Sequence, residues 1–212
     1  MVRPLYQPRT GTLPSRYEGG HAGLWYDKFC DKWKAPDRTR GTDWSLEADK
    51  SDNTDSSPKL CWIDTLTGQA HGAAAQLEET TTRLIRLSLQ QGGVSLVLQA
   101  KSRFVTGLGR SHPVENGFAW HPTLGTPYLP GSSIKGMVRA WAEQQADPKP
   151  DKATLARLFG APGRVGAVCF LDAVPIAPVW VEADLLTPHY APWSPEDPPG
   201  DWKAPKPIPF LV

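Results

Sequence analysis

The stretch that decides the fold is Gly125-Thr-Pro-Tyr-Leu-Pro-Gly-Ser-Ser-Ile-Lys-Gly-Met-Val-Arg139. Pro130 and Gly131 predict a turn, because neither residue easily continues a helix or a strand. Ser132 or Ser133 can then start a helix, since a serine hydroxyl accepts a hydrogen bond from one of the unpaired N–H groups of the first turn. The sequence therefore predicts a helix from Ser132 to about Gln145.

The predicted helix has an apolar face and a cationic face. Its apolar residues recur at helical spacing: Ile134, Met137, Val138 and Trp141. Lys135 and Arg139 are four residues apart and share another face. A helix N-terminus that carries hydroxyls, unpaired amides and two cations suits a phosphate backbone. An ordinary capped helix with solvated Lys and Arg is the alternative, and the order of residues is not that of a P-loop.

The run Pro130–Arg139 closely resembles the helix-opening motif of the RAMP superfamily, the RNA-binding backbone proteins of CRISPR effector complexes. Further blocks, in the same order along the chain, resemble the Cmr-type subunit that caps one end of the backbone filament. They are Phe104–Gly109, His112–Pro113, Glu115–Gly117, Leu158–Gly160, Phe170–Ala173 and Asp184–Tyr190. The resemblance covers roughly residues 95–190.

The resemblance implies an α+β, ferredoxin-like (RRM-like) RAMP fold. The sequence predicts a first strand over 94–105, a short helix over 152–159 and a nearly continuous apolar strand over 165–176. Residues 208–212 look like the beginning of another strand. The second helix, last strand and terminal Gly-rich loop of that fold have no counterpart here. We therefore expect a fold that is incomplete at the C-terminus, with long loops and an N-terminal helical extension.

The chain divides, on this interpretation, into 1–72 and 73–212. The first part is an arm, a short helix over 23–34 and a polar loop that includes the acidic residues of 43–55. The second part is the partial RAMP domain, with long loops over 107–130 and 184–193. Residues 73–90 combine a strand-like alternation with acids before Arg83 and a Gly92-Gly93 stop, and the charge order favours a helix.

Composition narrows the class of protein. The 212 residues carry a net charge of +1, yet the stretch from Arg83 to Arg139 contains seven basic residues and a single acidic one, Glu115. This window predicts a basic face on a neutral protein, although cations dispersed over the surface would give the same count. Three scattered cysteines indicate reduced cytosolic thiols instead of a disulfide framework. Neither an export signal nor a membrane-spanning run is visible, so a cytoplasmic protein is expected.

The candidate RNA contacts lie on the predicted helix start, at the end of the first strand and on the following loop. They are Gly131, Ser132, Ser133, Lys135, Arg139, Lys101, Arg103, Gly107, Arg110 and His112. The resemblance implies that they follow the guide RNA backbone and read shape and phosphate rather than sequence. It also implies a non-catalytic subunit near the 3′ end of the guide in antiviral defence. Its partners would be guide RNA, target RNA and the other backbone and small subunits of a Cmr-type complex.

Two other classes of function stay open. One is a RAMP endoribonuclease that uses His189 or Asp184, because a histidine and an aspartate can cleave RNA through its 2′-hydroxyl. The other is an interaction fragment, half a fold that another chain completes. A metal site is not expected, since the Cys and His residues lack paired ligand spacing, and no cofactor is expected. His21 and His71 are predicted at the surface. Phe118, Trp120 and His121 lie in the long loop and could stack on unpaired bases, but they are predicted to anchor the loop to the core or to a neighbouring subunit.

Overall fold

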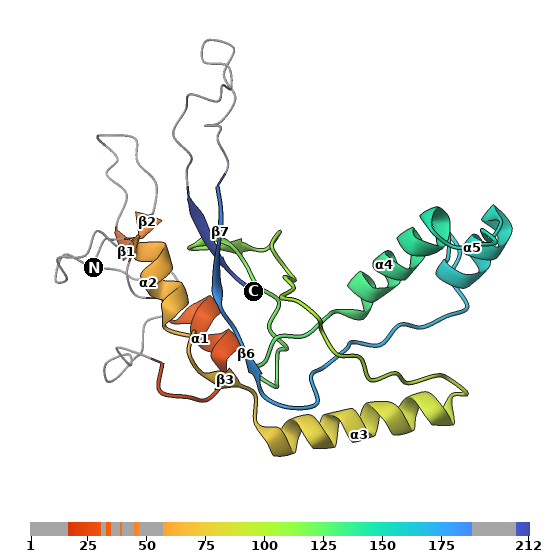
Figure 1. Cartoon of the computed structure of the whole chain (residues 1–212), viewed down its shortest axis with the longest axis horizontal. Helices are drawn as coiled ribbons and strands as arrows, with labels where there is room; N and C mark the ends of the chain where they lie inside the picture. Colours follow the sequence, from red (N-terminus) through yellow and green to blue (C-terminus); the bar gives the residue numbers. More distant parts are fainter. Residues whose placement is uncertain (1–16, 31–32, 35–38, 40–44, 47–56, 188–206) are drawn as a thin grey trace, which may run out of the picture.

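The computed structural model of the chain describes residues 17–30, 33–34, 39, 45–46, 57–187 and 207–212 (Figure 1). Its helices are α1 (Ala22–Lys28), α2 (Pro58–Asp64), α3 (Ala74–Gln90), α4 (Gly131–Gln144) and α5 (Lys152–Phe159). Its strands are β1 (Trp33–Lys34), β2 (Ser45–Leu46), β3 (Ala70–His71), β4 (Ser111–His112), β5 (Glu115–Asn116), β6 (Val179–Trp180), β7 (Ala183–Leu186) and β8 (Ile208–Leu211). This mixed content agrees with the predicted α+β class.

The strands of the described residues form antiparallel pairs and no larger sheet. The pairs are β1–β2, β3–β6, β4–β5 and β7–β8. The longest is β7–β8, in which Ala183 lies opposite Leu211 and Leu186 opposite Ile208. The predicted strand at the end of the chain is thus confirmed. Its partner β7 falls in a region predicted to be a loop, so that part of the prediction was wrong.

An aromatic core joins segments that lie far apart in the sequence. Trp25 of α1 stacks on Trp62 of α2, with ring centroids 5.5 Å apart. Phe118 and Trp120 from the long loop pack into the same cluster, which also takes Leu211 from β8. The prediction that these two loop aromatics anchor their loop is confirmed. The core therefore draws on both of the regions predicted as 1–72 and 73–212.

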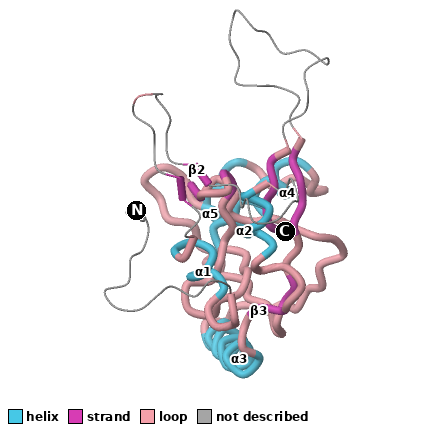
Figure 2. The backbone as a smooth tube through the Cα atoms, turned by 90° about the vertical axis from the view of Figure 1, so that its left-hand side faces the viewer, coloured by secondary structure: helices cyan, strands magenta, loops and turns pink. Residues whose placement is uncertain are grey.

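The remaining part of the molecule has little buried surface. Leu77 is the buried residue of α3, and Gly131 is the buried residue of α4. Figure 1 shows α4 and α5 on one side and α1, α2 and β7 on the other, with α3 along the lower edge. Figure 2 views α3 nearly along its axis and shows it below the other labelled helices. These amphipathic helices keep much of their apolar surface exposed.

Two predicted strands are extended but unpaired. Residues 94–105 form no β-ladder with any described residue. Within 165–176, the pairing is the single bridge of Ala173 with Leu129. The prediction of sheet strands was wrong for these segments in this structure, because an extended backbone becomes a strand only beside a hydrogen-bonding neighbour.

The helix predictions were better where local signals are strong. The helix predicted over 73–90 is α3, and the one over 152–159 is α5. Asp151 caps α5 by accepting a hydrogen bond from the N–H of Thr154 at 2.7 Å, and Gly160 ends the helix with φ of 87°. The helix predicted over 23–34 ends early, at Lys28.

Two further features differ from the sequence prediction. Helix α2, which the sequence analysis did not predict, packs on the core through the buried Trp62 and Ile63. His71 was expected at the surface but is buried, with its Nε2 2.7 Å from the carbonyl oxygen of Leu66. Among the described residues, no helix combines the length and apolar character that crossing a membrane requires.

Candidate RNA-binding surface

The start of α4 is fixed by packing against another segment. Helix α4 begins at Gly131, one residue before the predicted start, with Pro130 at the N-cap. The side chain of Asp172 accepts a hydrogen bond from the Gly131 N–H at 2.7 Å. Ser132 and Ser133 therefore lie exposed in the first turn instead of capping it. The prediction of a serine cap was wrong, because a carboxylate 41 residues further along the chain takes that role.

Gly131 lies where two backbones approach closely. A Cβ at this position would overlap the carbonyl oxygen of Phe170 and would lie 2.9 Å from its carbonyl carbon. Beside it, Leu129 and Ala173 exchange two backbone hydrogen bonds of 2.9 Å each. The Pro-Gly turn is thus docked on residues 170–173, and this docking directs the first turn of α4.

The two cations of α4 differ in their surroundings. The Nε of Arg139 lies 2.8 Å from an Oε1 atom of Glu143, one turn further along the exposed face. Lys135 is half-buried and forms no ion pair with any described residue. The helix therefore presents one unpaired ammonium group and one guanidinium shared with a carboxylate, close to two exposed serine hydroxyls.

The cations at the end of the extended segment are also unequal. Arg103 lies between two acids, with its Nη1 3.4 Å from Glu182 and its Nη2 3.4 Å from Asp184. Lys101 is exposed and forms no ion pair within the described part of the chain. Arg103 thus tethers the extended segment to the region of β7, which lowers the net positive charge there.

Gly107 and Arg110 belong to a small hairpin. Gly107 has φ of 81°, a conformation that favours glycine, and a Cβ there would lie 2.7 Å from the backbone nitrogen of Ala119. Its carbonyl accepts the N–H of Arg110 at 3.0 Å. The hairpin of β4 and β5 follows, and its turn holds Pro113. Sequence reasoning missed this hairpin within the long loop.

Arg110 borders a pocket of about 340 Å³. Its charged and polar lining residues are His21, Asp27, Lys28, Arg110 and Tyr128. Burial raises the pKa of the Asp27 carboxyl, and the positive charges of Lys28, Arg110 and His21 act against that shift. Lys28 is a cation near the predicted rim that sequence reasoning did not select.

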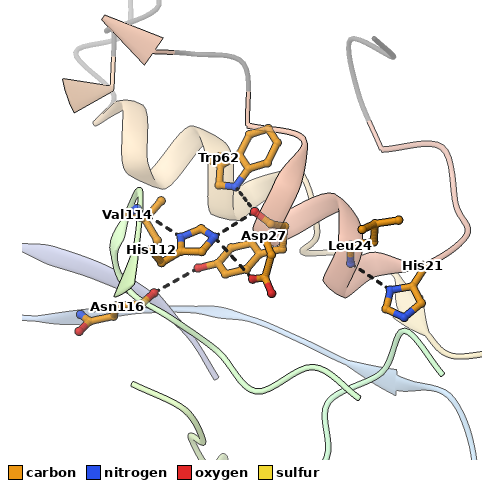
Figure 3. Close-up of polar contacts among 8 residues, drawn as sticks. His21, Leu24, Asp27, Trp62, His112, Val114 and Asn116 are labelled. Atoms are coloured by element: carbon orange, nitrogen blue, oxygen red, sulfur yellow. Dashed lines mark hydrogen bonds and ion pairs between the residues drawn. The ribbon is translucent and has the colours of Figure 1, made fainter. Parts of the chain in front are cut away.

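The ring of His112 points into the protein. It stacks on Tyr26 with ring centroids 3.9 Å apart, and its Nε2 lies 2.9 Å from the Tyr26 carbonyl oxygen (Figure 3). Its Nδ1 accepts the N–H of Val114 at 3.3 Å. Burial lowers the pKa of His112 to about 4, although the hydrogen bond to Tyr26 raises it and Lys28 lowers it further.

This geometry fixes the protonation state and the role of His112. A neutral ring that donates from Nε2 and accepts at Nδ1 satisfies both nitrogens, whereas Asp27 lies 3.9 Å away, too far to hold a proton there. The expectation that His112 contacts RNA does not fit its buried side chain. The ring instead fixes the hairpin against α1.

The candidate residues therefore fall into separate groups. Gly131, Ser132, Ser133, Lys135 and Arg139 share the start of α4. Gly107, Arg110 and His112 belong to the hairpin region, and Lys101 and Arg103 lie on the extended segment near β7. Figure 1 shows α4 well apart from α1 and β7. One RNA would have to extend across these groups to touch them all.

Of the candidate catalytic residues Asp184 and His189, the structure describes Asp184. Asp184 accepts the N–H of Leu185 at 2.8 Å in addition to its contact with Arg103. His189 lies outside the described residues. Among the residues that the structure describes, no group of three or more His, Cys, Asp or Glu side chains could hold a metal ion.

Part of the chain matches a known protein family. Residues 97–192 match the family model described as the RAMP superfamily. The matched residues include the docked Pro-Gly turn, α4 and α5, and thus the motif that resembles this superfamily.

The individual relatives are Cmr6 subunits. The CRISPR system Cmr subunit Cmr6 of Pyrococcus furiosus is 29% identical, and the match covers 54% of this chain and 52% of the relative. The Cmr6 subunit of Saccharolobus solfataricus is 31% identical, with coverage of 49% and 37%. The chain thus spans about half of the first relative's length and over a third of the second's.

A solved structure has a related fold. A chain in the cryo-EM structure of the type III-B Cmr-beta complex bound to cognate target RNA superposes with a TM-score of 0.52 at 20% sequence identity. The match covers 72% of this chain and 54% of that chain. At this identity the likeness concerns the fold.

Proposed function

We propose that this chain is a non-catalytic RNA-binding subunit of a type III CRISPR ribonucleoprotein. In this proposal it caps the backbone filament near the 3′ end of the guide RNA and contributes to antiviral defence in the cytoplasm. Its partners are guide RNA, target RNA and the other backbone and small subunits. The observation that carries the proposal is the exposed, cationic start of α4 within a segment that matches the RAMP superfamily.

The geometry refines how phosphate would bind there. Asp172 occupies the N–H of Gly131 and places a negative charge at the end of the helix. Phosphate oxygens would therefore meet the hydroxyls of Ser132 and Ser133 and the ammonium group of Lys135. Arg139 lies one turn away and contributes a second cation when a phosphate replaces Glu143 as the partner of its guanidinium group. Such contacts follow the RNA backbone without reading its sequence.

The other candidates contribute unequally in this proposal. Lys101 and Arg110 are exposed and extend the cationic surface. Arg103 is held by two carboxylates and adds less. Gly107 and His112 shape the hairpin that presents Arg110 and do not touch RNA themselves.

The test is a double substitution, Lys135→Ala with Arg139→Ala, in the assembled complex. The matched control is Lys152→Ala with Arg157→Ala, which removes two exposed cations from the neighbouring helix α5. Losing two phosphate contacts should lower the slope of log affinity against log salt by roughly 1.4, at about 0.7 per contact on single strands. An unchanged slope and unchanged guide content in the double variant would refute the phosphate role of α4.

The endoribonuclease alternative has a direct test. Asp184 already interacts with Arg103 and with the N–H of Leu185, so it is not a free base in this structure. We therefore propose that the chain does not catalyse cleavage. The assembled complex would be incubated with labelled target RNA, followed by the Asp184→Ala and His189→Ala variants. Cleavage that persists in both variants supports a binding role, and cleavage lost in either one contradicts it.

We also propose that the chain contributes strands and helices to a ferredoxin-like sheet. The extended segment 94–105 would be the first strand of that sheet, α4 its first helix and the segment 165–176 a further strand. The exposure of both segments favours this reading and, with it, the second candidate function: a half-fold interaction fragment that another polypeptide completes.

A further inference from the structure

The pocket beside α1 has a volume of about 340 Å³ and carries charges of both signs. Pockets for small ligands span about 300–1,000 Å³, so this one lies at the lower end of that range. Its size suits a single small molecule or one unit of a polymer. Its charged and polar lining residues come from α1, its N-cap and the segment 107–130, and they are His21, Asp27, Lys28, Arg110 and Tyr128.

The carboxylate of Asp27 lacks a donor within the described part of the chain. Its side chain is 37% exposed, and the Nε2 of His112, which lies 3.9 Å away, donates instead to the carbonyl of Tyr26 (Figure 3). No other described residue donates a hydrogen bond to this carboxylate. A carboxylate that has lost water without gaining donors is stabilised by a ligand that brings N–H groups.

The walls of the pocket are fixed by contacts within the chain. The Nδ1 of His21 accepts the N–H of Leu24 at 2.9 Å, so the ring is a donor at Nε2, which lies 2.9 Å from the carbonyl oxygen of Pro122. His21 thereby joins α1 to the loop. Tyr128 is half-buried, and its ring packs against the ring of His121 with centroids 5.2 Å apart. An aromatic ring held in this way offers a surface on which an unpaired base can stack.

The mixture of charges selects the class of ligand. Lys28 and Arg110 are exposed, and both lie close enough to Asp27 to act on its pKa. A free cation would be repelled by these two side chains, and a free phosphate would be repelled by the carboxylate. A nucleotide avoids both conflicts, because its base can donate hydrogen bonds while its phosphate accepts them.

The geometry of a carboxylate distinguishes among the four RNA bases. Its two oxygens can accept two parallel N–H groups. Guanine presents such a pair, the N1–H and one N–H of the 2-amino group, on its Watson–Crick edge. Adenine and cytosine present an amino group beside an unprotonated ring nitrogen, and the N3–H of uracil lies between two carbonyl oxygens. The carboxylate therefore favours guanine.

We propose that this pocket binds a guanosine 5′-phosphate unit, with the Asp27 carboxylate accepting the N1–H and the 2-amino N–H of guanine. Lys28 and Arg110 contact the phosphate, and Tyr128 stacks on the base. The inference deepens the proposed RNA-binding function and rests on it, because an unpaired guanosine of RNA is the expected source of this unit. Free guanosine 5′-monophosphate (GMP) offers the same chemistry. Unlike the phosphate contacts at α4, this contact reads the identity of a base.

The test measures binding of the full chain to labelled single-stranded RNA decamers by fluorescence anisotropy. One decamer contains uridine throughout, and the other three carry a single central guanosine, adenosine or cytidine. We expect the guanosine decamer to bind roughly tenfold more tightly than the other three, the discrimination that one bidentate base contact supplies. Unlabelled GMP and adenosine 5′-monophosphate (AMP) serve as free nucleotides, and GMP should bind in preference to AMP. This comparison requires no variant of the protein.

Asp27→Asn tests the pocket itself. The amide keeps the shape of the side chain but replaces one acceptor by a donor, so the preference for guanosine and for GMP should disappear. Asp64→Asn is the matched control, because burial also raises the pKa of Asp64, which ends α2 and does not line this pocket. It should keep the tenfold preference. Unchanged hydrogen exchange of the core amides of 62–66 shows that the Asp27→Asn chain is folded.

The other outcomes separate this inference from the proposed RNA-binding function. Equal affinity for the four decamers, with GMP bound no better than AMP, overturns the guanosine site and leaves the phosphate contacts of α4 untouched. Preference for GMP over AMP without binding of any decamer supports the pocket and refutes the RNA-binding role. A guanosine preference that persists in Asp27→Asn places the base elsewhere and overturns the proposal. Loss of a protein subunit from the assembled Asp27→Asn complex, with decamer binding unchanged, assigns the pocket to a protein contact and also overturns it.

Discussion

Replacing Gly131 by alanine should loosen α4, whereas the same replacement at Gly136 should stabilise it. Both glycines lie in α4, and neither has a positive φ. A Cβ at 131 would overlap the Phe170 carbonyl, whose carbon lies 2.9 Å away, and these are backbone atoms that cannot rotate aside. A Cβ at 136 would meet nothing within 4 Å. Comparing the two variants therefore separates the effect of close backbone packing at residue 131 from the effect of helix propensity at residue 136.

The expected magnitude follows from the contacts that must open. Moving the helix start away from residues 170–173 breaks the capping hydrogen bond from Gly131 to Asp172, a loss of about 1 kcal/mol. It also breaks the two hydrogen bonds between Leu129 and Ala173, a loss of about 2 kcal/mol. Alanine returns up to about 1 kcal/mol through its helix propensity. Gly131→Ala should therefore lose about 2 kcal/mol, and Gly136→Ala should gain up to about 1 kcal/mol.

Native-state hydrogen exchange is the appropriate assay, because α4 lies outside the aromatic core and can open locally. A difference of about 3 kcal/mol between the variants corresponds to roughly a hundredfold difference in the protection of the α4 amides. Protection of α1 and α2 should remain the same in both variants. Equal or greater protection of α4 in Gly131→Ala than in the unsubstituted chain would refute the close-packing argument.

Other substitutions test the hairpin and its histidine. Gly107→Ala should destabilise the fold by about 2 kcal/mol, because residue 107 has φ of 81° and a Cβ there would contact Ala119. Thermal unfolding measures this loss. Gly109→Ala is the control and should leave the stability nearly unchanged, because a Cβ at 109 has nothing within 4 Å. For His112, the folded-state pKa of about 4 lies below the unfolded value of about 6.5, so the unfolded chain takes up the proton first as the pH falls. Its contribution of up to about 3 kcal/mol is present above pH 6.5 and is lost between pH 6.5 and 4. Urea unfolding across this range should be less dependent on pH in His112→Gln, and an identical pH dependence in both proteins would contradict the buried neutral ring.

Local signals in the sequence predicted the elements that local chemistry determines. Helix α5 has both of its ends encoded nearby, by the Asp151 side chain at its start and by Gly160 at its stop. Helix α4 was predicted one residue too late, because its start depends on Asp172, which no local pattern connects to Pro130. The missed helix α2 did carry a signal, since Pro58 occupies its first position, where proline is favoured.

Long-range packing explains the remaining differences. Nothing in the surroundings of His71 or His112 along the sequence shows that tertiary contacts bury both rings. The alternating pattern of 94–105 correctly predicted an extended backbone, but pairing requires a neighbour, which no described residue supplies. The candidate residues of the one motif at the start of α4 do lie together, and their role in RNA binding stays a prediction. The prediction was less accurate in grouping cations that are distant in the sequence on one surface, because the structure places them in separate groups.

The tryptophan side chains that the structure describes form two groups of intrinsic optical reporters. Trp25, Trp62 and Trp120 are buried in the aromatic core, whereas Trp141 on α4 and Trp180 on β6 are 59% and 66% exposed. Emission from the first group is shielded from aqueous quenchers, and emission from the second is open to them. Trp141 follows Arg139 by two residues on the helix whose surroundings are in question. The part of the iodide or acrylamide quenching that disappears in Trp141→Phe should therefore register whatever covers α4, without any label being attached to the protein.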